Sequence, residues 1–581
     1  MRFLRKVILV FLVLLLVLAI WIWWNRPRKV NMAAYVPADS LIYLETNDLP
    51  DIATGIISTE AWKALAPFAG IKSNLGNLNW LSRLASWTGI GPADAVVLSR
   101  AQIAVTVLGL DAADAGDTLK IKPRYAVVVE THTSESRART AIENRVGDFA
   151  RRAYGEPRVE QRETDGAKYI IWIAPDNERR IVAAMMGSIA VIGNDESSVQ
   201  ACLAVRRNER PSLDGNPQLA EMRRRVGGSD ALAFGYVSAE GSARLFEMWA
   251  TIYAAQSSLD SRAQSALASL LPPLAKKILG GVGWSAHLAE GAIEDRYYLA
   301  LQHGVASKLK SALTTRQDMI LTVPELLPAE TYSLSRYNCR DPAQAWRGLN
   351  VAITSQADTL GSIIITRVLD ALLQPYGIEE PDSFLSAIGS EIATARLDDA
   401  NSGTVTIVEV RDEKPLQKFV TQRIGAKPRI EVVGEVVMLI SNNEKRDAAS
   451  FVGGHLILGN AENVRRCLEA LRLKQTLSAD DDFRRTTNHT SATNSANVAT
   501  FTEDYEHARS FMKAMSNQRG LRERPINEVA LENALKGLRY AVSETQIVEG
   551  GFEKKTRSSF GQFGTLASQF STDNAPNAAV K

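Results

Sequence analysis

The sequence predicts an α+β fold of two tandem repeats, each a mixed and largely antiparallel sheet with helices, behind one N-terminal transmembrane helix. Three observations lead to this prediction. A strand–turn–helix pattern occurs twice, at residues 188–205 and 454–471. Paired β-rich segments separated by turn residues surround each copy, as in hairpins. An uncharged run of eighteen residues, 7–24, stands near the start of the chain.

The amino terminus is predicted to be a membrane anchor. Residues 1–6, the predicted cytoplasmic leader, contain three basic side chains. As a helix, residues 7–24 would cover about 27 Å, which is enough for a thin bilayer core. Trp21, Trp23 and Trp24 close the run, as tryptophans do at a membrane interface. A cleaved signal peptide is the alternative, but the length of the run and its bulky end favour a retained anchor.

The charges around this run indicate an orientation. A short basic leader normally stays in the cytoplasm while the chain that follows is exported. No later segment has an uncharged apolar run of this length. The sequence therefore predicts a single-pass protein of the bacterial inner membrane with its bulk in the periplasm, and the lipid bilayer is an expected partner through residues 7–24.

The composition after the anchor is that of ordinary globular protein. The chain has 67 Lys+Arg and 65 Asp+Glu residues, and residues 1–30 hold six of the basic ones and none of the acidic ones. The remainder therefore carries 61 basic and 65 acidic residues, a net charge of −4. This balance excludes the basic surface that nucleic-acid binding needs. A body of about 550 residues is expected to form two to four domains.

The repeated stretch is predicted to be a buried strand, a tight turn and a helix. Gly193-Asn194 and Gly459-Asn460 permit the bend, because glycine is free in φ and asparagine tolerates unusual backbone angles. Acidic residues after each turn suit the positive end of a helix dipole. Cys202 and Cys467 lie at matching places on the two helices and are predicted to be buried. Cys339 stands apart, so the sequence shows no disulfide framework or metal spacing.

Further short matches fall in the same order in both halves of the chain. Pro37-Ala38-Asp39 corresponds to Pro328-Ala329-Glu330, and 157–160 corresponds to 428–431. A collinear set of such matches indicates an internal repeat. The predicted division of the chain is a leader at 1–6, an anchor at 7–24, a first repeat at 31–303, a linker at 304–327, a second repeat at 328–561 and a disordered tail at 562–581.

Hydrophobic periodicity predicts the elements of one copy in order. Strands are expected at 40–44, 101–110, 124–130 and 231–237, with hairpins over 158–174 and 180–192 and a closing hairpin over 280–301. Helices are expected at 49–87, at 134–153 and from residue 241, where Pro272 and Pro273 should interrupt the helix. The second copy closes with a similar hairpin over 538–557. A Ser/Thr/Asn-rich stretch, 486–497, is expected to be an exposed loop.

The sequence contains no complete catalytic or metal-binding pattern. The six histidines lack the H-E-x-x-H spacing, and there is no G-x-S-x-G elbow, Walker loop or G-x-G-x-x-G. Residues 307–310 fit S-x-x-K, but the partner motifs are missing. The acidic triplet 480–482 and the arginine triplet 223–225 could bind a cation and a lipid headgroup, but solvated helix faces explain them better. The sequence therefore predicts no catalytic, cofactor-binding or metal-ligating residue, and no cofactor.

Asn47 and Asn338 are the candidate site residues. Each follows the first strand of its copy, at the same offset from the Pro-Ala-acid motif. They could line a pocket shared by the two copies. A role as turn residues explains both asparagines as well, and it is the preferred interpretation.

Two motifs carry a resemblance to a known family. The sequence Tyr35-Val36-Pro37-Ala38-Asp39 leads into a strand, and Ile192-Gly193-Asn194 is followed by a helix and Leu213-Asp214. In these features the chain resembles a bacterial family of membrane-anchored proteins described as a domain of unknown function. The resemblance implies an N-terminal anchor, a Pro-Ala-Asp strand and a Gly-Asn turn, and it implies no activity. The second copy departs from it at Glu330, which replaces the aspartate.

The leading hypothesis is a non-enzymatic, membrane-tethered envelope protein that binds a ligand or a partner protein of the envelope. A duplicated scaffold without catalytic residues at matching places favours this hypothesis. The first alternative is an uncharacterised hydrolase or transferase with a site between the two repeats. The second alternative is a passive scaffold of an envelope complex.

Overall fold

The structure is a computed structural model that describes most of the chain between residues 29 and 569. The described ranges are 29–46, 49–71, 101–114, 119–256, 261–316, 322–357, 380–398, 403–443, 446–488, 496–516, 525–538 and 540–569, with a few single residues between 362 and 378. Every structural statement below concerns these residues.

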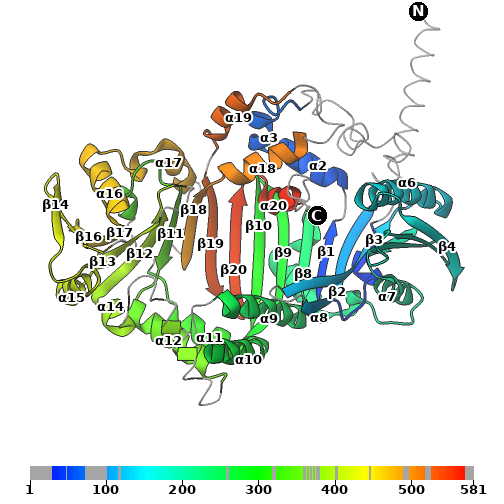
Figure 1. Cartoon of the computed structure of the whole chain (residues 1–581), viewed down its shortest axis with the longest axis horizontal. Helices are drawn as coiled ribbons and strands as arrows, with labels where there is room; N and C mark the ends of the chain where they lie inside the picture. Colours follow the sequence, from blue (N-terminus) through cyan, green and yellow to red (C-terminus); the bar gives the residue numbers. More distant parts are fainter. Residues whose placement is uncertain are drawn as a thin grey trace, which may run out of the picture.

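One antiparallel sheet of 20 strands runs through the described chain (Figure 1). The first half contributes ten strands: β1 (Ile42–Thr46), β2 (Gln102–Asp114), β3 (Leu119–Glu130), β4 (Arg158–Thr164), β5 (Ala167–Ile173), β6 (Arg180–Met186), β7 (Ile189–Gly193), β8 (Ala233–Val237), β9 (Leu279–Ala289) and β10 (Ala292–Leu301). The second half contributes β11 (Ser333–Asn338), β12 (Ile388–Arg396), β13 (Thr404–Val410), β14 (Arg429–Val433), β15 (Val436–Ile440), β16 (Asp447–Val452), β17 (His455–Asn460), β18 (Val498–Glu503), β19 (Tyr540–Val548) and β20 (Gly551–Ser558).

The strands of the two halves pair in the same order. From the outer edge inward, the first half runs β4, β5, β6, β7, β3, β2, β1, β8, β9, β10. The second half runs β14, β15, β16, β17, β13, β12, β11, β18, β19, β20. The halves join where β10 pairs with β20, from Ile293 opposite Ser558 to Ala300 opposite Gly551. Descent of the halves from one duplicated segment stays a prediction.

Helices cover both faces of the sheet. Those of the first half are α2 (Leu49–Ser58), α3 (Glu60–Leu65), α6 (Glu135–Tyr154), α7 (Glu196–Arg206), α8 (Pro217–Val226), α9 (Ala239–Gln256), α10 (Ser261–Ile278) and α11 (His303–Ala312). Those of the second half are α12 (Pro342–Thr354), α14 (Pro381–Ala387), α15 (Glu413–Ile424), α16 (Ala461–Leu473), α17 (Asp481–Asn488), α18 (Tyr505–Ser516), α19 (Glu528–Leu535) and α20 (Gly561–Gln569). Short 3-10 helices are η1 (Met32–Tyr35), η3 (Leu213–Gly215), η4 (Gly228–Asp230), η5 (Val323–Leu326) and η7 (Leu477–Ala479).

The repeated strand–turn–helix stretch forms as the sequence predicts, as β7 with α7 and as β17 with α16. Asp195 caps α7 by accepting from the Ser198 N–H at 3.1 Å, and Asn460 caps α16 by accepting from the Asn463 N–H at 2.7 Å. Cys202 and Cys467 are both buried, and burial raises the pKa of each thiol to about 12. The two cysteines are therefore neutral core residues beneath the sheet.

A third hydrophobic cluster takes its side chains from both halves. Trp62 and Leu65 of α3 pack with Phe511 of α18, Leu531 of α19 and Phe560, which follows β20. The Phe511 ring centroid lies 6.5 Å from that of Trp62 and 4.2 Å from that of Phe560. Figure 1 shows the same arrangement, with α2 and α3 beside α18 and α19 at the top of the molecule. Helices of one half thus complete a core of the other.

The structure corrects the predicted fold class. What it shows is one large antiparallel sheet with helices, rather than separate sheet domains behind a membrane helix. Within the described ranges, no helix is long and apolar enough to cross a bilayer. This finding overturns the predicted transmembrane helix, the single-pass class and the inner-membrane location. Residues 7–24, on which those predictions rested, lie outside the described residues.

Three local predictions also differ from the structure. The helix α10 continues through Pro272 and Pro273, because Leu271 and Leu274 on either side are buried and hold the segment against its neighbours. The predicted linker contains α11 and η5, whose apolar residues pack against the sheet and its helices. The predicted disordered tail begins with α20, which is anchored by the buried Phe560.

Candidate functional site

Two adjoining cavities lie where β18 ends and β19 begins. The larger has a volume of about 710 Å³ and the smaller a volume of about 320 Å³. Asp504, Leu538 and Tyr540 line both of them, so the two cavities adjoin. We call the pair the acidic groove, defined by these three residues and the lining side chains named below.

Carboxylates dominate the larger cavity. Arg466 is shared between Glu330, at 3.4 Å, and Asp398, at 3.5 Å. One guanidinium therefore serves two carboxylates. Arg485 of α17 pairs with Asp482, and the acidic residues of the lining still outnumber the basic ones. The six acidic and two basic lining residues are Glu330, Asp398, Asp480, Asp482, Glu503 and Asp504, with Arg466 and Lys536.

The acidic residues are far apart in the sequence. They meet because the ends of three neighbouring strands and the start of one helix lie side by side. Glu330 precedes β11, Asp398 follows β12, and Glu503 ends β18. Antiparallel pairing of β11 with both β12 and β18 brings these three strand ends together. The start of α17 adds Asp480 and Asp482. The topology of the sheet therefore builds the negative cavity.

Tyrosine rings supply the aromatic surface of this cavity, from Tyr332, Tyr505 and Tyr540. The Tyr540 hydroxyl donates to the Thr331 carbonyl at 3.0 Å. The pKa of Tyr540 is raised well above its usual value, first by burial and then by the field of Glu503 and three further carboxylates. The hydroxyl therefore stays protonated, and the fields of four carboxylates converge on its ring.

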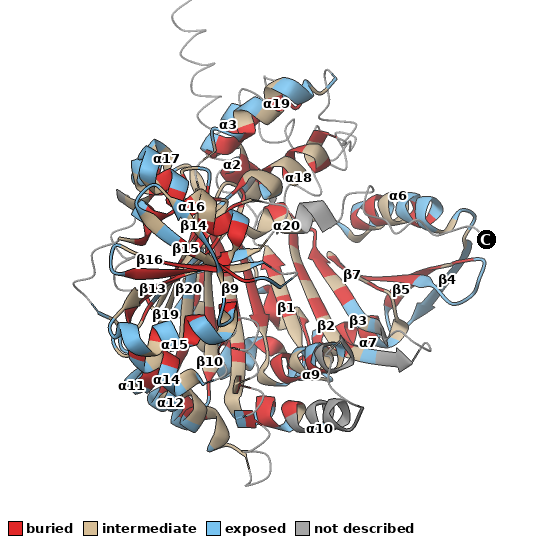
Figure 2. Cartoon of the chain, turned by 60° about the vertical axis from the view of Figure 1, so that its left-hand side comes forward, coloured by how far each residue is buried: buried red, intermediate tan, exposed pale blue. Residues whose placement is uncertain are grey.

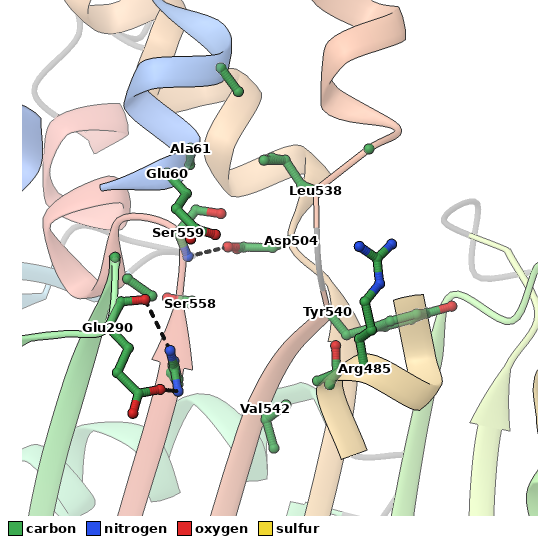
Figure 3. Close-up of a pocket in the computed structure, with 16 residues that line it drawn as sticks. Glu60, Ala61, Glu290, Arg485, Asp504, Leu538, Tyr540, Val542, Ser558 and Ser559 are labelled. Carbon is green, nitrogen blue, oxygen red and sulfur yellow. Dashed lines mark hydrogen bonds and ion pairs between the residues drawn. The ribbon is translucent and has the colours of Figure 1, made fainter. Parts of the chain in front are cut away.

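Asp504 lines both cavities but is tied into the fold. Its carboxylate accepts a hydrogen bond from the backbone N–H of Ser559, as Figure 3 shows. Its carbonyl accepts from the Ala508 N–H at 3.1 Å in the first turn of α18. Burial raises the pKa of Asp504, and the hydrogen bonds from Ser559 partly offset that rise. The geometry gives Asp504 a structural role, joining β18 and α18 to the end of β20.

The smaller cavity is built by both halves of the chain. Arg557 of β20 donates to the Glu290 carboxylate at 2.9 Å and to the Glu290 carbonyl at 3.1 Å. The Glu60 N–H, at the start of α3, donates to the Gly291 carbonyl at 2.8 Å. Figure 3 shows Glu60 and Glu290 on one side of this cavity and Arg485 of α17 on the other. Its charges are mixed, so the negative potential belongs to the larger cavity.

The structure places Asn338 in the fold rather than in a described cavity. Asn338 is 3% exposed at the end of β11. Its side chain accepts from the Arg316 N–H at 2.9 Å and donates to the Arg316 carbonyl at 3.0 Å, so it clamps the segment that joins the two halves. It is absent from the lining of the described cavities. Asn47, the other candidate, lies outside the described residues.

Replacing Asn338 by alanine should lower the free energy of unfolding by about 1–3 kcal/mol, because the buried asparagine makes two hydrogen bonds to the Arg316 backbone that the alanine cannot make. Ligand binding by the folded protein should not change. Urea unfolding would measure the loss, with Asn533→Ala at an exposed position of α19 as the control. An Asn338 variant of unchanged stability that loses binding would show that the asparagine belongs to the site instead.

The other motifs of the sequence have structural partners. Lys308, an intervening residue of the S-x-x-K pattern at 307–310, donates to the Ser355 hydroxyl at 2.8 Å, and the pattern lies on α11. Arg223 reaches the buried Glu45 at 2.7 Å, and its two neighbours both pair with Glu221. Asp480 caps α17 by accepting from the Phe483 N–H at 2.7 Å. Among the residues that the structure describes, no three His, Cys, Asp or Glu side chains are placed to hold a metal ion.

Sequence reasoning missed the acidic groove. The sequence presents Asp480 and Asp482 as part of an acidic triplet, but nothing in it shows that Glu330, Asp398 and Glu503 stand beside them. Histidine and cysteine are absent from the described lining of both cavities.

Comparisons with protein-family models, with curated proteins and with solved structures find no match to this chain. The resemblance carried by Pro37-Ala38-Asp39 and Gly193-Asn194 therefore gains no support from them. Because no known protein matches, the geometry of the acidic groove is the basis for proposing a function.

Proposed function

We propose that the chain is a non-enzymatic binding module whose acidic groove takes a ligand with two or more positive charges. One observation carries the proposal: six carboxylates and three tyrosine rings surround a single cavity of about 710 Å³ that has two basic residues in its lining. Carboxylates gathered in a cavity attract cations more strongly than scattered surface charges do, because the surrounding protein screens them less than water does. An organic cation could meet both the charges and the rings.

The aromatic rings of this region already receive cations within the protein. The Arg396 guanidinium lies over the Tyr332 ring at 5.0 Å, and the Arg509 guanidinium lies over the Tyr505 ring at 5.9 Å. A positive charge over a tyrosine face is stabilised by the ring's electron density. One face of each of these two rings is therefore covered by an arginine, and the ammonium or guanidinium group of a ligand would have to lie against the other face.

The shape of the groove favours an extended organic ligand. A volume of about 710 Å³ is within the usual range of small-molecule sites, and the adjoining cavity lengthens the groove toward α3. A linear polyamine and a lysine-rich peptide segment share the required chemistry, since both carry ammonium groups on flexible apolar stems. The experiment below separates these two sources.

Titration calorimetry of the full chain with spermidine, and separately with a short lysine-rich peptide, tests the proposal. The double variant Glu330→Gln/Glu503→Gln should bind the preferred probe about tenfold more weakly, a loss of about 1.4 kcal/mol. Affinity should also fall as salt rises, because the attraction is electrostatic. The matched control is Glu156→Gln/Glu163→Gln, which removes the same charge from two exposed positions around β4 and should leave the affinity unchanged.

Three outcomes would count against the proposal. If neither spermidine nor the peptide binds at low salt, the groove does not take a cationic ligand. Equal weakening by the control pair would show that only the net charge of the chain matters. Chemical conversion of a bound probe, followed by mass spectrometry, would contradict the non-enzymatic part and return the hydrolase or transferase to first place.

A further inference from the structure

The two ends of the sheet differ in how they are protected. Of the strands that the structure describes, β4 is the last at one end and β14 is the last at the other, and they lie far apart in Figure 1. An end strand exposes unpaired N–H and C=O groups, which are a template for another strand. Proteins usually block such an edge with charged side chains, so the side chains of each end strand decide its behaviour.

β4 carries the charged side chains of a blocked edge. All seven of its residues are exposed, as the colour of β4 in Figure 2 also shows. Arg158 pairs with Glu160 at 3.1 Å, and Arg162 pairs with Glu196 of α7. An incoming strand would have to displace or desolvate these charges, which is unfavourable. Val159, 50% exposed, is the one large apolar residue of the strand.

β14 begins with the same Arg-apolar-Glu order as β4, but it continues with Val432 and Val433 where β4 has Gln161 and Arg162. Ile430 is 65% exposed and Val432 is 61% exposed. In the β14–β15 hairpin Val432 stands opposite Val437, which is itself 48% exposed, and Ile430 stands opposite Leu439. Residues directly opposite share a face of the sheet, so the exposed apolar side chains form one patch. Among the described residues, no backbone hydrogen bond reaches the outer edge of β14.

We propose that β14 pairs antiparallel with β14 of a second copy of this chain, about a two-fold axis at Ile430. In that register Ile430 meets the partner's Ile430, and Arg429 meets the partner's Glu431. By symmetry, Glu431 meets the partner's Arg429, so the pairing gives two complementary charge pairs around one apolar contact. The proposal does not depend on the ligand of the acidic groove.

Charge favours the register with its axis at Ile430, because this register sets Arg429 and Glu431 of the two copies against each other. Opposite residues must lie on the same face, so a two-fold axis within the strand can pass only through a residue. An axis at Glu431 would set two copies of this carboxylate against each other, which is unfavourable. Arg465 holds Glu431 in place through bonds of 2.6 and 2.9 Å and leaves the strand edge free. The axis at Ile430 also places Val432 against the partner's Pro428, an apolar contact.

The contact is short, so the dimer should be weak. A five-residue strand with one apolar patch is smaller than a typical stable interface, and a dissociation constant on the order of 10–100 µM is expected. Sedimentation of the full chain over a concentration series should therefore show a monomer–dimer equilibrium. Ile430→Lys should raise the dissociation constant at least tenfold, because it replaces the central apolar contact by two facing charges. Val159→Lys, at the corresponding place on β4, should leave it unchanged.

Cross-linking tests the register itself. Ile430→Cys places two thiols across the proposed axis, and mild oxidation should give a covalent dimer on a non-reducing gel. Val432→Cys places its thiol opposite the partner's Pro428, so it should cross-link far less. Val159→Cys should give no dimer. Cys202 and Cys467 are buried and should not contribute, and the Val159→Cys chain, which also contains the part-buried Cys339, shows any background from that thiol.

Specific results would overturn the proposal. One is a monomer at all concentrations up to about 1 mM, an affinity below that of any specific dimer expected here. Another is a dimer that Ile430→Lys and Val159→Lys weaken equally. A third is stronger cross-linking through Val432→Cys than through Ile430→Cys, which would exclude the two-fold axis at Ile430.

Discussion

Replacing Phe511 by alanine should lower the free energy of unfolding by about 3–5 kcal/mol, the usual loss for a large aromatic residue in a core. Phe511 is 2% exposed and contacts Trp62 of the first half and Phe560 of the second. The alanine leaves a cavity that neither half can close alone. Urea unfolding followed by tryptophan fluorescence and by circular dichroism would measure the loss.

The same variant tests whether the two halves unfold together. If the shared cluster and the pairing of β10 with β20 join them, both probes should give one transition that shifts to lower urea. Phe149→Ala is the matched control, because Phe149 is 55% exposed on α6 and its loss should change the stability by less than about 0.5 kcal/mol. Two separate transitions, with only one of them moved by Phe511→Ala, would show that the halves are independent.

Replacing His455 by glutamine should remove about 3 kcal/mol of stability near neutral pH, the usual effect of breaking a buried ion pair. The His455 Nε2 atom lies 3.5 Å from the Glu391 carboxylate, and both side chains are buried. Its Nδ1 atom lies 3.0 Å from the Gly453 carbonyl and donates to it. A neutral ring with its proton on Nδ1 would face the carboxylate with a lone pair, so the charged ring is favoured.

The consequence is a defined pH window. Glu391 raises the pKa of His455 above its usual 6.5. The stability that the charged histidine contributes is complete below pH 6.5 and is lost as the pH rises through the higher pKa of the folded state. Burial raises the pKa of Glu391, but hydrogen bonds from His455 and Thr322 outweigh it and lower this pKa below 4.5. The stability that the charged carboxylate contributes is lost as the pH falls through the lower pKa of the folded state. The pair therefore stabilises the fold most between the two folded pKa values.

Melting temperatures across pH 4–9 would check this window, with the wild-type chain and His455→Gln compared at each pH. The difference between them should be largest in mildly acidic solution and should shrink above neutral pH. His303→Gln, at an exposed position of α11, is the control and should follow the wild type throughout. A difference that grows with rising pH would show that His455 is neutral in the folded protein.

Local patterns of the sequence predicted much of the secondary structure. The hairpin over Glu290-Gly291 forms as expected, because both residues adopt the positive φ that such a turn needs. The helices after Gly193-Asn194 and Gly459-Asn460 begin directly after these turns, where the acidic residues predict a helix start. Periodicity and turn chemistry are local properties, so they can be read without knowing the fold.

Long-range pairing could not be predicted in the same way. Nothing local distinguishes β10 and β20 as partners, because their charged, alternating residues are compatible with many neighbours. The acidic groove depends on that pairing and on the order of β11, β12 and β18. Asn338 shows the same limit, since its partner Arg316 belongs to a segment whose position only the folded chain reveals. Sites assembled from strand ends are therefore the hardest to see in a sequence.

The shared core of α3, α18, α19 and Phe560 has a consequence for synthesis on the ribosome. Trp62 emerges early, while the aromatic residues that cover it are translated roughly 450–500 residues later. At about 5–20 residues per second, that interval is roughly 25–100 seconds. During this time the nascent chain presents an apolar helix with nothing to bury it, so chaperone binding at α2 and α3 is expected until the last strand and helix are released.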